Sequence, residues 1–588
     1  MVARGAGLVA LAGVILALPL SAAASGSGWI EGEPFLPPGG SQLSSLPAVA
    51  CASPTVCTAV GSYVYDSSNQ DTAPLLLEEI AGAWELQGVE APLPRNAVAN
   101  SSASLSSVSC ASTGNCTAVG AYSTASGTPP LLLTETAGKW RAATAPADPF
   151  GGPWPYIGGQ ETTSVSCAAA GDCAATTGAG FLLDEAGGKW SALQAPLPSN
   201  AGQPSVLGVS CTSVGDCVAV GTYADLSGEP TWQGLVESET DNVWTASQAP
   251  LPQDAVGAWG SPTSITNVVC PSTGNCTAIG MYTSPQGNED GERGLLLDES
   301  NGVWSATPAP LPGDAGINNQ LRLSSLACSS AGNCSVVGTY DDDSAVRHWL
   351  VLTEASGTWT ADEPQLPDSI SLGQLKSVTC PNAAKCVAVG DVHEAGHVPE
   401  GLVLTWTRAP FNRQWSSVET VLPPDSPGVL DLSAITCLGT TTHCSATGLF
   451  EDGASTSQGL IATIGSKLLP PLPTIRAGVR ASTRLLTHGA VRVSPGITIA
   501  CPVASGSPCP VVAMITAKHV TLGRINMTLP ANGRPHALSF RLTTAGLKLL
   551  RQARSLSATL KGLTGIEGDT AATFQKKFTI KAPNGLKS

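Results

Sequence analysis

The sequence is poor in charge, in aromatic side chains and in long apolar runs. Only 12% of its 588 residues are charged, and it contains 8 Phe, 7 Tyr and 4 Met. A helix that spans a membrane takes about 20 predominantly apolar residues, and no run of that length occurs after residue 20. The repeated part of the chain, described below, also lacks the 3.6-residue periodicity of amphipathic helices. We therefore expect neither a membrane span in the mature protein nor a helical bundle.

The first 24 residues have the features of a secretory signal peptide. Arg4 precedes the apolar run "LVALAGVILALPL" from Leu8 to Leu20, and small residues follow at Ala22 to Ala24. A basic start, a short apolar core and an Ala-x-Ala site form the usual pattern. We expect the mature chain to begin at Ser25 and to be secreted, either extracellular or associated with the cell wall.

Basic residues are scarce before position 474 and abundant after it. From Thr474 onwards the chain has 16 Lys and Arg against two acidic residues, which leaves 13 basic and 42 acidic residues in the first 473. Such an asymmetry indicates two parts with different surfaces. We expect residues 25–472 to form one domain, 473–486 a linker and 487–588 a basic domain.

The 18 cysteines fall into nine closely spaced pairs, with none left over. The pairs are 51/57, 110/116, 167/173, 211/217, 270/276, 328/334, 380/386, 437/444 and 501/509. The first eight recur about every 55 residues, as do Trp29, Trp84, Trp140, Trp190, Trp244, Trp304, Trp359 and Trp415. A fixed period of this length is the mark of a repeat architecture.

Each repeat is expected to hold four short β-strands. In one unit they are "SSVSC" ending at Cys110, "CTAVGAY" from Cys116, "LLLTE" ending at Glu135 and "WRAA" from Trp140. A turn at Ala137 and Gly138 would place Glu135 opposite Trp140, and equivalent acids recur at Glu79, Glu185, Glu239, Glu299 and Glu354. Because these acids belong to separate units, we expect them to solvate or anchor their hairpins rather than to form a catalytic set.

Eight four-stranded units without helices predict an all-β fold, an eight-bladed β-propeller. Trp29 has no strands before it, and the last unit, after Cys437, has no tryptophan-bearing fourth strand. We expect the N-terminal Trp29 strand to complete that last blade and to close the ring.

The cysteine pairs are expected to form disulfides: Cys51–Cys57, Cys110–Cys116, Cys167–Cys173, Cys211–Cys217, Cys270–Cys276, Cys328–Cys334, Cys380–Cys386, Cys437–Cys444 and Cys501–Cys509. Paired antiparallel strands hold their Cα atoms at a distance that suits a disulfide. Zinc would need four converging ligands, and most pairs have no His nearby. A redox role would favour two cysteines separated by two residues at a helix N-terminus, and these pairs have neither feature.

Two other patterns bear on function. "HEAGH" from His393 to His397 matches a zinc-protease motif, but it falls in a loop with Gly396 and Pro399 instead of a helix. We interpret it as a coincidence and expect no metal, no cofactor and no catalytic residue. Trp154, Tyr156, Trp259 and Trp349 lie in or beside loops of one rim, where exposed aromatic side chains would suit a ligand; the alternative is that they fold down as plugs.

The "SVSC…CTAVG…LLLTE…GKW…LP" unit resembles repeats of secreted actinobacterial proteins and, more distantly, the Asp-box repeats of sialidase-type propellers. In the stretch from Leu133 to Trp140, Glu135 stands at the acid position, Gly138 lies one place late and Leu133 replaces a Ser. A sialidase would also offer an arginine triad, which the few Arg of residues 25–472 do not supply convincingly. This resemblance implies the fold and no particular activity.

The tail from about Arg484 alternates β-prone segments with one short helix after Thr544, and it resembles the small immunoglobulin-like β-sandwich of similar secreted proteins. Its positive charge could contact an anionic cell-wall polymer or the acidic propeller; we expect no nucleic-acid binding. We predict a monomeric, non-catalytic scaffold that binds an extracellular glycan or protein. The alternative is a carbohydrate-active enzyme, a sialidase-like glycoside hydrolase or a lyase.

Overall fold

The structure is a computed structural model. It describes residues 29–586 except 38, 67–70, 100, 148, 150–153, 155–161, 228–230, 256–262, 285–291, 317–319, 365–369, 395–399, 408–414, 420–429, 440–442, 453, 455, 470–473, 477–479, 487–489, 502–508, 519, 531–533 and 565–571. The expected signal peptide, residues 1–24, lies outside this part of the chain.

The described chain is almost entirely β-structure, built from repeated antiparallel sheets. In one of them, β6 (Ala103–Ser112), β7 (Asn115–Tyr122), β8 (Pro130–Glu135) and β9 (Trp140–Ala143) pair in sequence order. The central strands β7 and β8 are buried over most of their length, which explains the unbroken apolar runs in their sequence. The repeated glycine after "CTAV" is also required, because a Cβ on Gly120 would lie 2.0 Å from the Ser104 carbonyl oxygen, beside a bulge in β6.

The same strand order recurs along the chain. The sheets are β2 (Gln42–Ser53), β3 (Val56–Asp66), β4 (Asp71–Ile80) and β5 (Ala83–Glu90); β10 (Thr162–Ala169), β11 (Asp172–Thr177), β12 (Phe181–Ala186) and β13 (Lys189–Gln194); β14 (Ala201–Ser213), β15 (Asp216–Asp225), β16 (Thr231–Thr240) and β17 (Val243–Gln248); β18 (Ser264–Ser272), β19 (Asn275–Thr283), β20 (Glu292–Ser300) and β21 (Val303–Pro308); β22 (Arg322–Ser330), β23 (Asn333–Asp341), β24 (Arg347–Ala355) and β25 (Thr358–Asp362); and β26 (Ile370–Asn382), β27 (Lys385–Glu394), β28 (Glu400–Thr407) and β29 (Trp415–Glu419).

One further sheet joins the two ends of the repeated region. It combines β30 (Leu430–Cys437), β31 (Cys444–Glu451) and β32 (Ser457–Ile464) with β1 (Trp29–Gly32) as its outer strand. Trp29 pairs with Ile464 and Gly32 with Ile461. The predicted closure by the N-terminal strand is confirmed.

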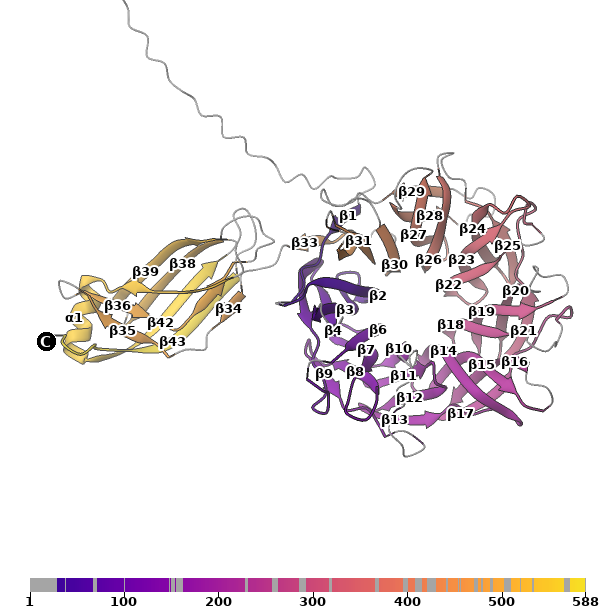
Figure 1. The fold of residues 1–588 in the computed structure, drawn as a ribbon, viewed down its shortest axis with the longest axis horizontal. Helices are drawn as coiled ribbons and strands as arrows, with labels where there is room; N and C mark the ends of the chain where they lie inside the picture. Colours follow the sequence, from indigo (N-terminus) through magenta and orange to yellow (C-terminus); the bar gives the residue numbers. More distant parts are fainter. Residues whose placement is uncertain are drawn as a thin grey trace, which may run out of the picture.

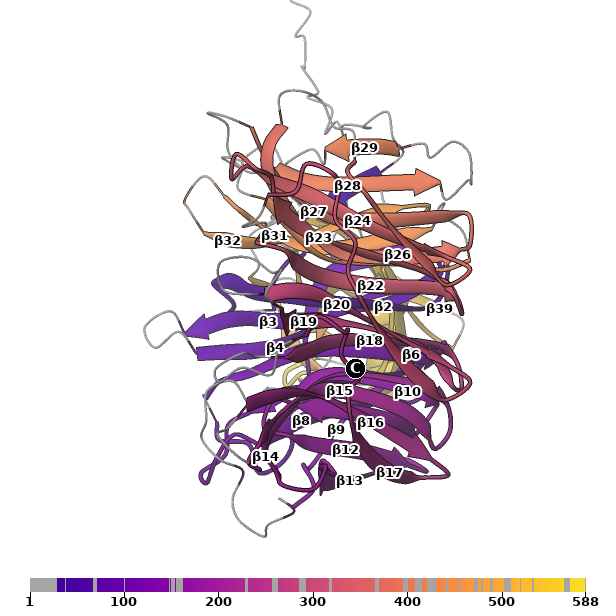
Figure 2. The same ribbon diagram turned by 90° about the vertical axis from the view of Figure 1, so that its right-hand side faces the viewer.

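The sheets stand side by side around a common centre, in the arrangement of a β-propeller (Figure 1). The first strands β2, β6, β10, β14, β18, β22, β26 and β30 face the centre, each contacts the next, and β2 contacts β30. Figure 2 shows strands running across the ring from one face to the other. The Cys–Cys turn and the turn between third and fourth strands therefore lie on one face, and the remaining loops lie on the opposite face.

Apolar side chains form the core between adjacent sheets. In one cluster, Val60 and Leu76 of the β2–β5 sheet pack with Val108 and Leu131 of the β6–β9 sheet. Polar contacts join the inner strands, because the serine before the first cysteine of one sheet accepts the backbone N–H of the next sheet's first cysteine. These contacts are Ser109 to Cys167, Ser166 to Cys211 and Ser210 to Cys270, at 2.9–3.1 Å.

All 18 cysteines form the nine expected disulfides. In the ring, each disulfide joins the first and second strands of one sheet directly across their turn. Nine disulfides indicate an oxidising environment. No helix in the described part of the chain is both long and apolar enough to cross a membrane.

The β2–β5 sheet has a fifth strand, which the sequence did not predict. After β32 the chain crosses to the neighbouring sheet, where β33 (Lys467–Leu469) pairs in parallel with β5. Leu468 pairs with Trp84, and the Lys467 N–H donates to the Gly82 carbonyl at 2.8 Å. The outer edge of this sheet is thus covered by the chain itself.

The C-terminal part forms sheets of its own around a separate apolar core. They are β34 (Thr474–Arg476), β37 (Thr498–Ala500) and β40 (Pro535–Ala537); β35 (Ser482–Leu485), β36 (Val491–Ser494) and β41 (Phe540–Arg541); and β39 (Val520–Leu529), β38 (Cys509–Ala517), β42 (Ser555–Thr564) and β43 (Ala572–Lys581). The predicted short helix is α1 (Thr544–Ala553), capped by the Thr543 hydroxyl, which accepts the Gly546 N–H. β34 and β35 fall within the stretch expected as a linker and belong to these sheets.

Candidate functional site

The strongest candidate sites are grooves between neighbouring sheets on the face that carries the disulfide turns. Each groove is built around the repeated glutamate and tryptophan. The register pairs Glu135 with Trp140, as predicted, and it does the same in the other five sheets: Glu79 with Trp84, Glu185 with Trp190, Glu239 with Trp244, Glu299 with Trp304 and Glu354 with Trp359.

Most of these glutamates are buried. They therefore do not solvate their hairpins, which was one of the two expected roles. Glu79 is 1% exposed and Glu185 5% exposed. Burial raises the pKa of Glu185 to about 7, although a long hydrogen bond from Thr134 lowers it in part. Burial, with the nearby charges of Asp184 and Asp216, raises the pKa of Glu239 to about 7. Carboxyl groups of this kind are partly protonated near neutral pH, so they can both accept and donate hydrogen bonds.

The residue before each repeated glutamate decides whether the next sheet's indole has a hydrogen-bond partner. Where that residue is acidic, it accepts the indole N–H across the interface: Trp140 donates to Glu78 at 2.7 Å, Trp244 to Asp184 at 3.1 Å and Trp359 to Asp298 at 3.0 Å. Thr134 and Ser238 hold this position in two other sheets. The buried Nε1 atoms of Trp190 and Trp304, which face those sheets, have no partner.

The grooves also differ in size. At the interface where Trp244 donates to Asp184, a pocket lined by Asp184 and Glu239 has a volume of about 20 Å³. The groove between the β6–β9 and β10–β13 sheets, where Trp190 lacks a partner, has a volume of about 410 Å³ and is lined by Thr134, Arg141, Glu185 and Trp190. A groove beside Ser238 also measures about 410 Å³, and one beside Asp298 and Trp359 about 720 Å³.

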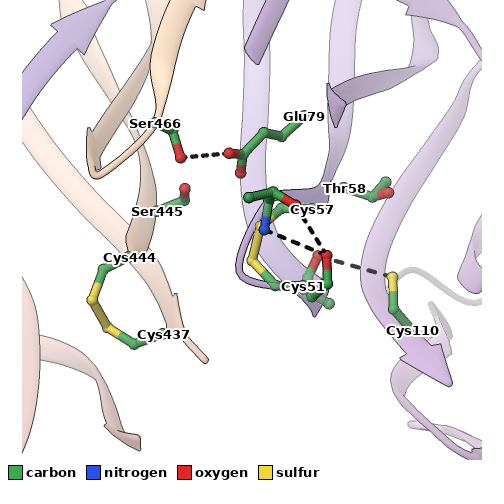
Figure 3. The surroundings of a disulfide bond; sticks show 12 residues. Cys51, Cys57, Thr58, Glu79, Cys110, Cys437, Cys444, Ser445 and Ser466 are labelled. Atoms are coloured by element: carbon green, nitrogen blue, oxygen red, sulfur yellow. Dashed lines mark hydrogen bonds between the residues drawn. A yellow bond between two sulfur atoms is a disulfide. The ribbon is translucent and has the colours of Figure 1, made fainter. Parts of the chain in front are cut away.

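At the ring closure the chain fills the equivalent position itself. The Ser466 hydroxyl donates to the Glu79 carboxylate (Figure 3), which opposes the effect of burial on the raised pKa of Glu79. The Trp84 indole donates to the Ser445 hydroxyl at 3.0 Å. Trp84 is fully buried, and Leu468 packs against the apolar cluster that contains it.

The same place is not a metal site. Cys51, Cys57 and Glu79 form a group of potential ligands within 4.8 Å of one another. Both sulfur atoms are joined in a disulfide, however, and a metal requires thiolates. The donor set therefore does not fit a metal ion.

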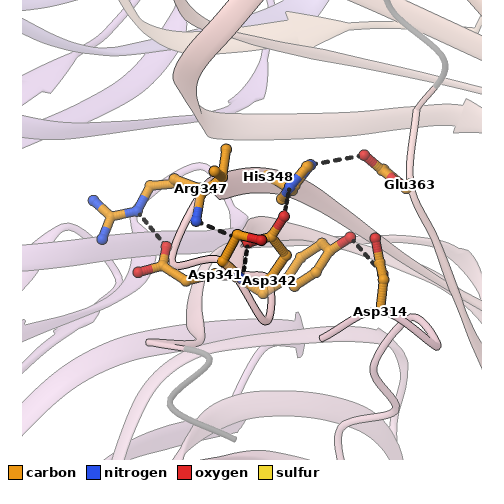
Figure 4. A network of polar contacts seen from close by, with 9 residues as sticks. Asp314, Asp341, Asp342, Arg347, His348 and Glu363 are labelled. Atoms are coloured by element: carbon orange, nitrogen blue, oxygen red, sulfur yellow. Dashed lines mark hydrogen bonds and ion pairs between the residues drawn. The ribbon is translucent and has the colours of Figure 1, made fainter. Parts of the chain in front are cut away.

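On the opposite face, a polar network surrounds His348 (Figure 4). Its Nε2 lies 3.1 Å from the Asp342 carboxylate and its Nδ1 2.8 Å from that of Glu363. The imidazole stacks on Tyr340, with ring centroids 5.3 Å apart. Burial disfavours the imidazolium, but the two carboxylates outweigh it, so the pKa of His348 is raised above 6.5.

A related network fixes the loop after β17. Asp254 accepts hydrogen bonds from Tyr282 at 3.0 Å and Ser284 at 2.8 Å, and it pairs with Arg293 at 2.7 Å. Although burial acts in the opposite direction, these contacts lower the pKa of Asp254. Tyr340 donates to Asp314 as Tyr282 donates to Asp254. Because the same contact recurs in two sheets, we interpret these networks as contacts that hold the loops in place.

Trp154 and Trp349 are buried and not exposed, which agrees with the alternative that they fold down as plugs. Trp154 is 8% exposed, makes an edge-on contact with Phe181 and donates to the Pro146 carbonyl at 3.0 Å. Trp349 is 4% exposed and belongs to the core between its sheet and the next. Both rings fill space between sheets, where a large apolar surface is most stable.

Three other named residues, Tyr156, Trp259 and His397, lie outside the described residues. His393 pairs through its backbone with Leu372, within β27. That position is in a strand, so it does not supply the helix that a zinc-protease motif needs. The role of the residue before each repeated glutamate was not predicted from the sequence, although the alternation of an acid with Thr or Ser at that position is visible there.

Comparison with known proteins gives no family. No family model matches the chain, and no curated protein matches it. Among solved structures, YCF48 bound to a D1 peptide is similar at 13% identity and a TM-score of 0.35, over 64% of this chain and 96% of that one. The WD40 repeats of RRP9 are similar at 9% identity and a TM-score of 0.36, over 61% of this chain and 94% of that one. Trypanosoma rangeli sialidase in complex with the inhibitor DANA is similar at 9% identity and a TM-score of 0.23, over 66% of this chain and 86% of that one. At these values the similarity carries no inference about ligand or activity.

Proposed function

We propose that the chain is an exported, non-catalytic binding protein: an eight-bladed β-propeller, residues 25–472, that recognises another protein or a glycan outside the cell. The basic C-terminal part, of immunoglobulin-like sandwich type, would orient the ring on its surroundings. The nine disulfides support an oxidising location, and the start of the sequence supports export.

The main support is the placement of the repeated glutamates. Each faces its own tryptophan within its own sheet, at an equivalent place in the ring. A hydrolase of the glycosidase type needs two carboxyl groups on either side of one bond, about 5–10 Å apart. Two of them, Glu135 and Glu185, line the groove between the β6–β9 and β10–β13 sheets. Because each is paired with the tryptophan of its own hairpin, we take them as repeated binding contacts and not as a catalytic pair.

Burial of Trp154 and Trp349 favours a protein ligand over a glycan. Sugar rings are commonly held by stacking on exposed aromatic faces, and these two indoles are packed in the core. Besides the indoles of Trp190 and Trp359, the grooves offer carboxyls, hydroxyls and strand edges, a combination that suits a polypeptide.

The C-terminal part is proposed to contact an anionic polymer of the cell wall, and the protein is proposed to be a monomer. Most of its charge is positive, as Lys and Arg outnumber acidic residues by 16 to two from Thr474 onwards. Contacts of this kind weaken with salt. Release from isolated walls by moderate salt would support the proposal, and retention of a variant that ends at residue 472 would contradict it.

The proposed function is tested by presenting the mature, disulfide-intact protein to an array of extracellular proteins and glycans, followed by a hydrolysis and lyase screen on every hit. Binding without turnover supports a binding protein. Turnover of a bound glycan would establish the alternative, a carbohydrate-active enzyme of sialidase or lyase type. No binding to any member of the array would contradict the proposed function.

A further inference from the structure

We propose that the groove between the β6–β9 and β10–β13 sheets binds an extended peptide, which adds to the edge of β13 as a parallel strand and places a Ser or Thr hydroxyl on Glu185 and a leucine two residues later beside Trp190. This inference rests on the proposed binding function and names the chemistry of one ligand.

The chain's own residues 466–469 show how such a segment is held. Ser466 donates its hydroxyl to Glu79, the repeated glutamate of the β2–β5 sheet. Two residues later, Leu468 lies opposite Trp84, the repeated tryptophan of the same sheet, in a parallel strand pair. A hydroxyl, one spacer residue and a leucine thus satisfy the glutamate, cover the indole and extend the sheet.

The corresponding position on the β10–β13 sheet is built from the same parts and is open. Within the described residues β13 pairs only with β12, so its outer edge offers backbone donors and acceptors. Glu185 is more than nine-tenths buried, and its Oε2 atom has no hydrogen-bond partner. The Trp190 Nε1 atom is also buried without a partner, and both residues line the groove.

A hydroxyl-bearing peptide matches both unpaired groups. A serine or threonine hydroxyl can donate to the Glu185 carboxylate, as Ser466 does to Glu79, while an oxygen of the peptide accepts the Trp190 N–H. Parallel pairing along β13 adds backbone hydrogen bonds that a sugar cannot make. The groove of about 410 Å³ has room for a side chain as well.

The neighbouring interface gives an internal comparison. There Asp184 accepts the Trp244 N–H, and only about 20 Å³ of space remains. Thr134 holds the place of Asp184 in the open interface. A single acidic residue at position 134 should therefore occupy the acceptor site of the Trp190 N–H, as Asp184 does for Trp244.

The test uses the full-length, disulfide-intact protein and a synthetic peptide with the sequence of residues 462–470, "ATIGSKLLP". Binding is measured by fluorescence polarisation of the labelled peptide. Hydrogen exchange then locates the site, with protection expected at residues 189–193. Peptides with the Ser466 or the Leu468 position changed to alanine should each bind about tenfold more weakly, because each removes one of the two anchoring contacts.

Two protein variants and one control complete the test. Glu185→Ala and Thr134→Asp should each weaken binding at least about tenfold, the first by removing the acceptor and the second by filling the site. Asp343→Ala, at an exposed carboxylate in the loop between β23 and β24 on the opposite face, should bind as the unchanged protein does. The melting temperature of each variant shows whether it is folded, and Thr134→Asp serves if Glu185→Ala does not fold.

Binding with protection at residues 189–193, lost in Thr134→Asp, supports the proposal. No binding, protection only along β5, or equal binding by the serine and alanine peptides would overturn it. If the extracellular array gives ligands while the peptide does not bind, this inference fails and the proposed function stands. Turnover of a glycan in the array would remove the proposed function whatever the peptide does.

Discussion

Glu237 is a carboxyl group in the layer that other sheets fill with leucine, and replacing it should stabilise the protein. It is fully buried in β16, and neither carboxylate oxygen has a hydrogen-bond partner. Its strand position corresponds to that of Leu133 in β8 and Leu297 in β20, both also fully buried. Burial raises the pKa of Glu237 from 4.5 to about 8.

The effect has a defined pH dependence. Between pH 4.5 and about 8 the folded protein keeps a proton on Glu237 that the unfolded chain releases. The free energy of unfolding therefore falls by about 1.4 kcal/mol per pH unit from this group alone, and by about 5 kcal/mol over the whole window. Below pH 4.5 both states are protonated, and above pH 8 both are ionised, so the contribution is flat outside the window.

Two variants separate the titration from packing. Glu237→Gln removes the titrating group and should gain stability relative to the unchanged protein as pH rises from 5 to 8.5, by about 4 kcal/mol. Glu237→Leu should gain a further amount of about 2 kcal/mol from apolar burial, at every pH. Denaturant midpoints at pH 5 and pH 8.5 measure both gains. Glu85→Gln, at an exposed glutamate of β5, serves as the control and should leave the midpoint unchanged at both pH values.

The reasoning fails if the difference between Glu237→Gln and the unchanged protein is the same at pH 5 and pH 8.5. It also fails if Glu237→Leu lowers the midpoint at both values, because the site would then not accept the leucine that its counterparts carry.

Three further outcomes follow from the contacts described. Replacing Cys110 and Cys116 together by serine should cost about 2 kcal/mol, since the closed loop is short, and denaturant unfolding of the variant and of the oxidised unchanged protein would measure the difference. Leu468→Asp should detach β33, lower the unfolding free energy by about 1–2 kcal/mol and speed hydrogen exchange along β5; unchanged exchange would count against the strand addition. In an NMR titration the pKa of His348 should lie above 6.5 and fall in Glu363→Gln; because that pKa is raised, the stability it supplies is complete below pH 6.5 and is lost as pH rises through the folded value.

Local and repeated features of this fold could be predicted from the sequence. The Cys pairs, the turn that places Glu135 opposite Trp140, and the missing strand that β1 supplies all follow from spacing within a unit or from comparison between units. Each of these contacts joins neighbouring strands, so the period of the sequence is enough to specify it.

Contacts between sheets could not be predicted in the same way. Trp154 and Trp349 are aromatic residues in or beside loops, as exposed binding residues often are. Each nevertheless packs in a core between two sheets, and the spacing of the repeats does not show which residues it contacts there. The contact of Ser466 with Glu79 joins residues 387 positions apart. Such pairings depend on how the ring closes, which no local pattern encodes.

The residue before each repeated glutamate offers a physical reason why the grooves differ although the units are alike. An acid there accepts the next indole N–H, as Asp184 does for Trp244, and in that case the two sheets meet with almost no space between them. Thr134 is too short to do so, and the unpaired Trp190 faces an open groove. The acid is not sufficient by itself, since Asp298 accepts the Trp359 N–H beside a groove of about 720 Å³. It follows that the acid fixes the indole, whereas closure also depends on the side chains at the groove mouth; variation at these few positions can give one repeated scaffold both sealed and open interfaces.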